Sequence, residues 1–282
     1  MNNFSDKNVL VTGCSSGIGL EVAKTLSSRG FEVFAGFREI SQASVLDGHA
    51  AVPVELDLDN SRSIETAVEF ILSKSNGRLY GLINNAAYGQ PGAVEDLPRA
   101  ALEKQFSTNV FGTQELTNLV LPGMRNQNEG RIVQISSILG FICLRFRGAY
   151  NASKYALEAL TDTMRLELAG TGIHLSLIEP GPVRSDFRKN ALNHFLANID
   201  AENSPYSTTY DRVLGRLQSL EEARFTLPES AVCDVCLHAL THKKPKIRYR
   251  VTVPTKIMAP LKRLLPDRLM DQVLLKSGDS DE

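Results

Sequence analysis

Short apolar runs alternate with longer segments of helical periodicity along this chain of 282 residues. The runs are largely continuous in hydrophobicity, which is typical of strands buried on both faces of a sheet. We predict strands at residues 9–11, 31–34, 51–56, 79–83, 131–135 and 173–178, and helices near 17–29, 61–74, 98–125 and 149–169. This alternation predicts an α/β fold of the Rossmann type, a doubly wound parallel sheet with helices on both faces.

No internal repeat, low-complexity linker or break in composition divides the sequence, so we predict one domain over residues 1–282. Hydrophobic residues make up 43% and charged residues 22%, and the net charge of −1 gives no field that would attract nucleic acid. The apolar runs are shorter than the roughly 18 residues that a membrane span needs. The first residues lack the basic flank and apolar stretch of a secretory signal. We therefore expect a cytoplasmic protein.

Two of the four cysteines, Cys233 and Cys236, form a C-x-x-C pair. This spacing occurs in redox and metal sites, but here it lies in an apolar stretch of helical periodicity without a second Cys or His pair nearby. Free cysteine packs as a small hydrophobic residue. We interpret both as buried helix cysteines and expect no metal.

A glycine-rich loop follows the first predicted strand and precedes a helix. It contains Gly13, Ser15, Ser16, Gly17, Ile18 and Gly19. Glycines here allow a tight turn and a close approach to a pyrophosphate, and the helix offers unpaired N–H groups and a positive dipole end. A plain tight turn would also explain the glycines, but a strand before and a helix after them favour a nucleotide.

Tyr150 and Lys154 are four residues apart, so on a helix they share one face. A phenol has a pKa of about 10, and a nearby ammonium lowers that pKa by stabilising the phenolate. Tyr150 can then give a proton to a carbonyl oxygen or take one from an alcohol. By itself, such a pair is usually a half-exposed surface pair.

The motifs together resemble those of the short-chain dehydrogenase/reductase superfamily, in its single-domain branch. Thr-Gly-x-x-x-Gly-x-Gly, Tyr-x-x-x-Lys and Pro180-Gly181 occur in the family's order, and Asn84–Ala87 follows the fourth strand with Ala87 where the family usually has Gly. The resemblance covers nearly the whole chain. Residues 246–268 look like those of bacterial NADP-dependent aldehyde reductases and their retinol and hydroxysteroid dehydrogenase relatives.

This resemblance implies a catalytic set of Asn109, Ser137, Tyr150 and Lys154. Ser137, thirteen residues before Tyr150 and preferred to its neighbour Ser136, would hydrogen-bond the substrate oxygen. Asn109 would hold a water of the proton relay, and both Tyr150 and Lys154 would also contact the cofactor, Lys154 at the nicotinamide ribose. Alternatively, the serine is a cap or turn residue and the asparagine is solvated or bonded to backbone.

Further cofactor contacts follow from the same resemblance. They are Asp57, Asn85, Ala86, Pro180, Gly181, Val183 and Ser185. Asp57 would contact the adenine, although it could instead cap the next helix. Val183 and Ser185 would lie beside the nicotinamide carboxamide and the pyrophosphate.

Arg38, at the end of the second predicted strand, favours NADP as the cofactor. An NAD enzyme typically places an acid here for the ribose 2′-hydroxyl, whereas this chain has no acid before Glu39. A guanidinium suits phosphate geometry, and Ser15 and Ser16 could add hydroxyl donors. A solvated arginine opening the next helix is the alternative.

Residues 186–227 are the expected substrate-binding segment. They contain Phe187, Phe195, Tyr206, Tyr210, Leu214 and Phe225 among charged residues. Apolar lining is usual for ligand sites and suggests a hydrophobic aldehyde, ketone or alcohol. Ordinary packing of a long loop explains the same residues about as well.

Two surfaces suggest partners. Ala149, Ala152, Ala156 and Ala159 form a small-residue stripe that fits either core packing or a second subunit, as in related homo-oligomeric enzymes. The basic amphipathic segment 243–276 has nine Lys/Arg and one acid between Lys243 and Arg268. Its apolar positions Ile257, Leu261, Leu264 and Leu265 could touch an anionic membrane weakly, although covering the protein's own core is the favoured explanation.

The sequence thus predicts an NADP-dependent oxidoreductase acting on a small carbonyl or alcohol substrate. Two other classes are less consistent with it. A non-catalytic nucleotide-binding regulator would have no need of the intact catalytic set. A nucleotide-sugar epimerase would need a different glycine spacing and a larger C-terminal domain.

Overall fold

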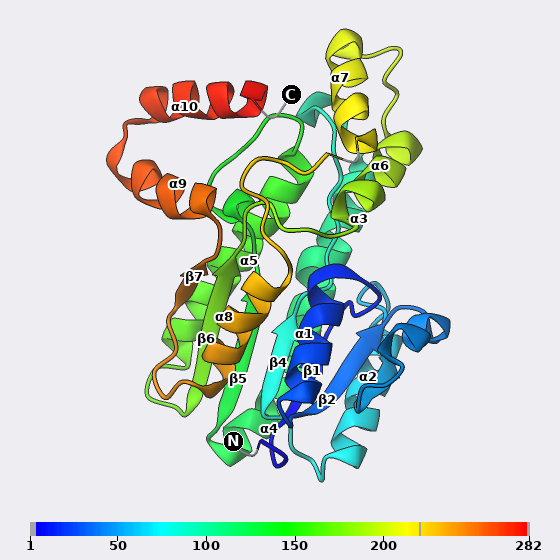
Figure 1. Cartoon of the computed structure of the whole chain (residues 1–282), viewed down its shortest axis with the longest axis vertical. Helices are drawn as coiled ribbons and strands as arrows, with labels where there is room; N and C mark the ends of the chain where they lie inside the picture. The colour runs from blue at the N-terminus through cyan, green and yellow to red at the C-terminus, as the bar shows by residue number, and fades with distance from the viewer. Residues whose placement is uncertain (1–3, 220, 281–282) are drawn as a thin grey trace.

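The computed structural model describes residues 4–219 and 221–280 and is built around a single seven-stranded sheet (Figure 1). All the strand pairings are parallel, in the order β3-β2-β1-β4-β5-β6-β7. The strands are β1 Asn8–Val11, β2 Glu32–Phe37, β3 Ala51–Glu55, β4 Gly81–Asn84, β5 Gly130–Ile135, β6 Ile173–Glu179 and β7 Arg248–Arg250. The predicted doubly wound parallel sheet is confirmed.

The helices cover both faces of this sheet. They are α1 Gly17–Ser28, α2 Ser61–Lys74, α3 Arg99–Phe106, α4 Thr113–Gln127, α5 Gly148–Glu167, α6 Phe187–Asn198, α7 Ser207–Gln218, α8 Ser230–Thr241, α9 Val253–Leu264 and α10 Asp267–Ser280. Short helical turns are η1 Ile40–Leu46, η2 Val94–Asp96, η3 Ser107–Gly112 and η4 Ile138–Gly140. One core lies between the sheet and α1 with α8, and a second lies between the sheet and α2 with α4. Burial on both faces explains why β1, β4 and β5 are buried throughout.

The strand order reverses between β1 and β4. The chain runs outward from β1 to β2 and β3, then crosses back to β4 on the other side of β1. In such sheets the crevice beyond the carboxyl ends of the strands at this switch point binds ligands. Helices α6, α7, α9 and α10 lie beyond the same ends of the strands, at the top of Figure 1.

The structure differs from the predicted elements in three places. The single helix expected at 98–125 is divided into α3, the π-type turn η3 and α4. Two helices, α6 and α7, occupy the segment 186–227, for which the sequence showed no clear strand pattern and no helix was predicted. Strand β7 was also missed, because three residues reading Arg-Tyr-Arg are too short to show the alternation of a strand.

Cys233 and Cys236 are buried on α8, which packs against α1. Both thiols are free, and burial raises the pKa of Cys233 to about 11 and raises that of Cys236 well above its ordinary value. The interpretation of this pair as packing residues is therefore confirmed. Within the described ranges, no cluster of His, Cys, Asp and Glu could hold a metal ion, and no helix is long and apolar enough to cross a membrane.

Candidate active site

The glycine-rich loop lies at the switch point between β1 and β4. Gly13 and Gly17 have φ of +70° and +55°, in the left-handed region that favours glycine. A Cβ on Gly19 would overlap the carbonyl oxygen of Gly13 and would lie 2.5 Å from Asn85 Nδ2. The backbone here has no room for a side chain at Gly19.

Helix α1 begins directly after this loop with its first turn open to an anion. Its N-cap residue, Ser16, makes no side-chain capping hydrogen bond, and the first turn has no acidic residue. Ser15 is exposed and Ser16 half-buried, while the Ile18 side chain packs onto the core beneath. Unpaired N–H groups at the positive end of a helix, next to a loop with glycine at positions 13 and 17, fit a pyrophosphate.

Thr12 attaches the loop after β4 to the glycine loop. Its buried Oγ1 accepts hydrogen bonds from the backbone N–H groups of Asn85 (3.0 Å) and Ala86 (2.9 Å). In return, Asn85 Nδ2 donates to the carbonyl oxygens of Thr12 (2.9 Å) and Gly13 (3.2 Å). Sequence reasoning selected Asn85 and Ala86 but omitted Thr12, although it opens the motif that carried the family resemblance.

Arg38 and Asp57 follow β2 and β3, so both lie at the carboxyl ends of the strands. The Arg38 side chain is exposed. Burial lowers the pKa of His194 on α6, and the charges of Arg38 and Lys104 lower it further. The capping alternative for Asp57 is wrong, because Asn60 caps α2 through the N–H groups of its first turn.

Tyr150 and Lys154 lie on successive turns of α5 and are 9% and 3% exposed. Lys154 Nζ donates to the carbonyl oxygen of Ile135 (2.7 Å) and is 5.7 Å from the centre of the Tyr150 ring. The half-exposed surface pair considered for this spacing is therefore wrong. Burial on this scale is expected for side chains that act inside a closed site.

The pKa values of the pair are set mainly by burial. Burial raises the pKa of Tyr150 to about 12, although the Ser137 hydroxyl and the charge of Arg147 act to lower it. Burial also lowers the pKa of Lys154 to about 8, against the opposing effect of the Glu158 carboxylate. The expectation that Lys154 brings the pKa of Tyr150 below 10 does not hold for the protein alone, because desolvation of the phenolate outweighs the distant ammonium.

Ser137 follows β5 and faces Tyr150, as its effect on the phenol shows. Its Oγ also accepts a hydrogen bond from the N–H of Leu139 (3.1 Å), so the serine caps the short helix η4 as well. The neighbouring Ser136 points elsewhere: a Cβ on Gly140 would lie 2.6 Å from its Oγ and 3.1 Å from Glu158 Oε1. Of the two serines, Ser137 is the one beside the phenol.

Asn109 is buried in the π-type turn η3, where it joins the loop after β4 to helix α5. Its Oδ1 accepts from the N–H of Tyr88 (3.1 Å), and its Nδ2 donates to the Tyr88 carbonyl oxygen (2.9 Å) and to Ser153 Oγ (3.1 Å). Asn109 is therefore not solvated, and it ties the loop after β4 to α5. Extra turns of this kind are frequent at functional sites.

The loop after β6 contacts both η4 and the glycine loop. The carbonyl oxygen of Pro180 accepts from the N–H of Ile138 (2.8 Å), and a Cβ on Gly181 would overlap the hydroxyl of Thr252. Val183 pairs with Leu227 in an isolated bridge. Ser185 reaches the glycine loop, since a Cβ on Gly17 would lie 3.1 Å from Ser185 Cβ.

Tyr150 belongs to an apolar cluster, which we call the apolar wall. It consists of Leu139, Ile142, Phe187, Met258, Leu261, Leu265 and Met270. Only Phe187 of this wall comes from the segment 186–227; Phe195 and Tyr210 pack in a separate core with Leu214 beside them, and Phe225 is exposed. The packing explanation is correct for Phe195 and Tyr210. Sequence reasoning missed Met258 and Met270, because their place in the cluster that contains Tyr150 depends on how α9 and α10 fold back.

Comparison with known proteins agrees with this arrangement. The chain is 44% identical over 268 residues to the uncharacterized oxidoreductase YbbO of Escherichia coli (strain K12), covering 95% of this chain and 94% of the relative. It is 33% identical to the 3-ketodihydrosphingosine reductase of Bacteroides thetaiotaomicron, covering 94% and 96%. The solved structure of an actinorhodin polyketide ketoreductase variant with NADPH superposes with a TM-score of 0.73 at 26% identity, covering 89% of this chain and 97% of that one. The family model described as short chain dehydrogenase matches residues 7–194, and the chain belongs to the short-chain dehydrogenase/reductase family.

Proposed function

We propose that this protein is an NADPH-dependent oxidoreductase that reduces a hydrophobic aldehyde or ketone and, in reverse, oxidises the corresponding alcohol. The observation that carries the proposal is the burial of Tyr150 and Lys154 on one face of α5, beside Ser137 and at the carboxyl end of β5, where Lys154 binds the carbonyl oxygen of Ile135. An acid–base group on the same side of the sheet as a glycine loop and helix N-terminus that fit a pyrophosphate suits hydride transfer coupled to proton transfer.

The cofactor, when bound, supplies or accepts the hydride. The Tyr150 hydroxyl gives its proton to the carbonyl oxygen, and the Ser137 hydroxyl donates a hydrogen bond to the same oxygen. Lys154 places a positive charge beneath the phenol and holds the nicotinamide ribose. Asn109 holds the relay water and keeps α5 in position through Ser153.

Several residues would hold the dinucleotide. The pyrophosphate would lie on the first turn of α1 and the glycine loop, with Ser185 opposite. Asp57, Asn85 and Ala86 would line the adenosine, and Pro180, Gly181 and Val183 the nicotinamide. The choice of NADPH rests on the exposed Arg38, with Ser15 and Ser16 as further donors to the 2′-phosphate.

A hydrophobic substrate is supported by the apolar wall around Tyr150. The relative named 3-ketodihydrosphingosine reductase is consistent with a long-chain carbonyl compound. We assign substrate binding to residues 186–227 through Phe187, together with Met258 and Met270 of the C-terminal helices. One domain would therefore contain both sites.

The C-terminal segment 243–276 supports a weak peripheral contact with an anionic membrane. The apolar positions of α9 and its C-cap residue Leu265 divide. Leu261 and Leu265 pack against the cluster that contains Tyr150, whereas Ile257 and Leu264 are 52% and 78% exposed. Three cations and no acid lie within α9 itself. Co-sedimentation with anionic vesicles at low salt tests this contact, and loss of binding in Leu264→Ser would assign it to α9.

A homo-oligomer is supported by the outer face of α5 and its neighbours. Ala149 is buried, but Ala152 and Ala159 are exposed, and the nearby Phe111 of η3 is 61% exposed. Sedimentation velocity would test a dimer through this face. The four free thiols fit a reducing compartment, and we propose a cytoplasmic location.

The experiment that tests the proposed function is oxidation of NADPH at 340 nm with a panel of aldehydes and ketones of increasing chain length. We expect turnover that improves with apolar chain length. Tight NADPH binding without turnover of any panel member would favour the alternative, a non-catalytic nucleotide-binding regulator.

A further inference from the structure

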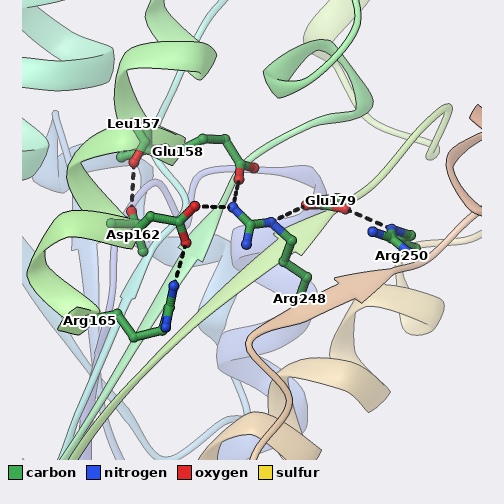
Figure 2. Close-up of polar contacts among 8 residues, drawn as sticks. Leu157, Glu158, Asp162, Arg165, Glu179, Arg248 and Arg250 are labelled. Carbon is green, nitrogen blue, oxygen red and sulfur yellow. Dashed lines mark hydrogen bonds and ion pairs between the residues drawn. The ribbon is translucent and has the colours of Figure 1, made fainter. Parts of the chain in front are cut away.

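Six charged side chains join the catalytic helix α5 to strands β6 and β7 (Figure 2). They are Glu158, Asp162 and Arg165 of α5, Glu179 of β6, and Arg248 and Arg250 of β7. Arg248 lies at the centre, with nitrogen–oxygen distances of 3.0 Å to Glu158, 2.6 Å to Asp162 and 2.9 Å to Glu179. Arg250 reaches Glu179 at 3.4 Å, and Arg165 reaches Asp162 at 3.3 Å.

This network, which we call the Arg248 network, is buried most deeply at Glu158 and Glu179. Buried ion pairs are weak evidence for stability, because desolvation offsets much of their attraction. Its position suggests a different use. Glu179 directly precedes Pro180, which opens the loop proposed to line the nicotinamide, and Glu158 lies one helical turn after Lys154.

The relation between Glu158 and Lys154 is electrostatic. Residues four apart on a helix are neighbours on one face, and Lys154 is buried, so its ammonium has lost most of its hydration. Its Nζ contacts the neutral carbonyl oxygen of Ile135. Glu158 is buried one turn farther along the same face of α5, and the charge of its carboxylate acts to raise the pKa of Lys154.

Glu158 in turn needs cations to remain ionised. It faces Lys154 and Asp162 of its own helix, Ser136 after β5, Glu179 of β6 and Arg248 of β7. Burial and the charge of Glu179 raise the pKa of Glu158 to about 7, while Ser136 and Arg248 act to lower it. Arg248 therefore supports the ionised carboxylate, and it lies well beyond residue 194, where the family match ends.

We propose that Glu158, held ionised by Arg248, is a positioning residue that supplies the counter-charge for the Lys154 ammonium. The proposal rests on the proposed function only in that Lys154 must be charged beneath Tyr150 for turnover. The C-terminal strand β7 then contributes to the site without touching substrate or cofactor.

The direct test is the titration of Lys154 in the cofactor-free protein. Side-chain NMR of labelled lysine monitors the titration, and the variant Lys154→Met identifies the signal of Lys154. We expect Lys154 to titrate near pH 8 in the unaltered protein. Glu158→Gln removes the counter-charge, so the pKa of Lys154 should fall by about one unit, a tenfold change in its ionisation constant. Glu158→Asp should restore part of that shift.

The matched control is Asp162→Asn, which removes another carboxylate bonded to Arg248, one turn farther from Lys154. Asp162→Asn should lower thermal stability about as much as Glu158→Gln does, but it should leave the pKa of Lys154 nearly unchanged. In kinetics, Glu158→Gln should move the alkaline limb of kcat/KM to lower pH, and Asp162→Asn should not.

An unchanged Lys154 titration in Glu158→Gln would overturn the proposal, as would equal shifts in both variants. If Glu158→Gln does not fold, Glu158→Asp gives the same decision through a smaller downward shift. Absence of NADPH oxidation by the unaltered protein is a different outcome: it contradicts the proposed function and leaves the NMR result to decide this inference.

Discussion

The ring of Phe187 lies edge-on against the ring of Tyr150, with 5.1 Å between centroids and 63° between the ring planes. Phe187 also fills the space over Gly89, where a Cβ would lie 2.6 Å from its ring. The first residue of α6 therefore forms part of the boundary of the space above the proposed acid–base group.

Phe187→Ala tests whether this ring contacts the substrate. Loss of an apolar contact should raise KM for long-chain carbonyl compounds about tenfold, in line with the 1–3 kcal/mol typical of such contacts, with a smaller effect on kcat. Leu196→Ala on the same helix is the control, since Leu196 is 62% exposed and should leave KM unchanged. Equal KM values in the two variants would contradict a substrate contact by Phe187.

Tyr150→Phe should abolish turnover while leaving NADPH binding nearly intact. The variant removes only the proton that the mechanism transfers, and a positioned acid–base group contributes about 10²–10⁴-fold. Steady-state kinetics and fluorescence titration with NADPH measure the two effects separately. Near-normal turnover by a correctly folded Tyr150→Phe protein would refute the assignment.

Arg38→Asp should weaken the binding of NADPH by at least tenfold and leave the binding of NADH nearly unaffected. Hydrogen bonds to a charged group contribute about 1.5–3 kcal/mol, and aspartate would in addition repel the 2′-phosphate. The control is Arg78→Asp. Arg78 is an exposed arginine before β4, at the amino ends of the strands and therefore on the opposite side from Arg38. Equal kcat/KM values for NADPH and NADH in the unaltered enzyme would show that Arg38 does not select the cofactor.

Gly19→Ala should abolish cofactor binding and lower stability, since the added Cβ would overlap the Gly13 carbonyl oxygen and force the loop apart. Gly215→Ala in α7 is the matched substitution, because nothing lies within 4 Å of its Cβ. There, alanine should raise the free energy of unfolding by about 0.5–1 kcal/mol, through higher helix propensity. Thermal melts with and without NADPH check both results, and a Gly19→Ala protein that NADPH still stabilises would contradict the site.

The sequence alone predicted the features of this protein that depend on residues close together in the chain. Continuous apolar runs predicted six of the strands, because strands buried on both faces must be apolar at nearly every position. Helical spacing placed Tyr150 and Lys154 on one face, and the glycine loop was visible between its strand and helix. Each of these patterns spans a few residues, so local geometry suffices to interpret it.

Only the tertiary structure decided the relationships between distant segments. Thr12 and Asn85 are 73 residues apart, and Glu158 and Arg248 are 90 residues apart. No local pattern in the sequence could therefore predict the hydrogen bonds within these two pairs. The apolar positions of α9 formed one face in sequence, yet Leu261 packs against the cluster that contains Tyr150 and Leu264 is left exposed. The pKa values of Tyr150 and Lys154 likewise follow from burial, because desolvation depends on everything that surrounds a side chain and not on its neighbours in the chain.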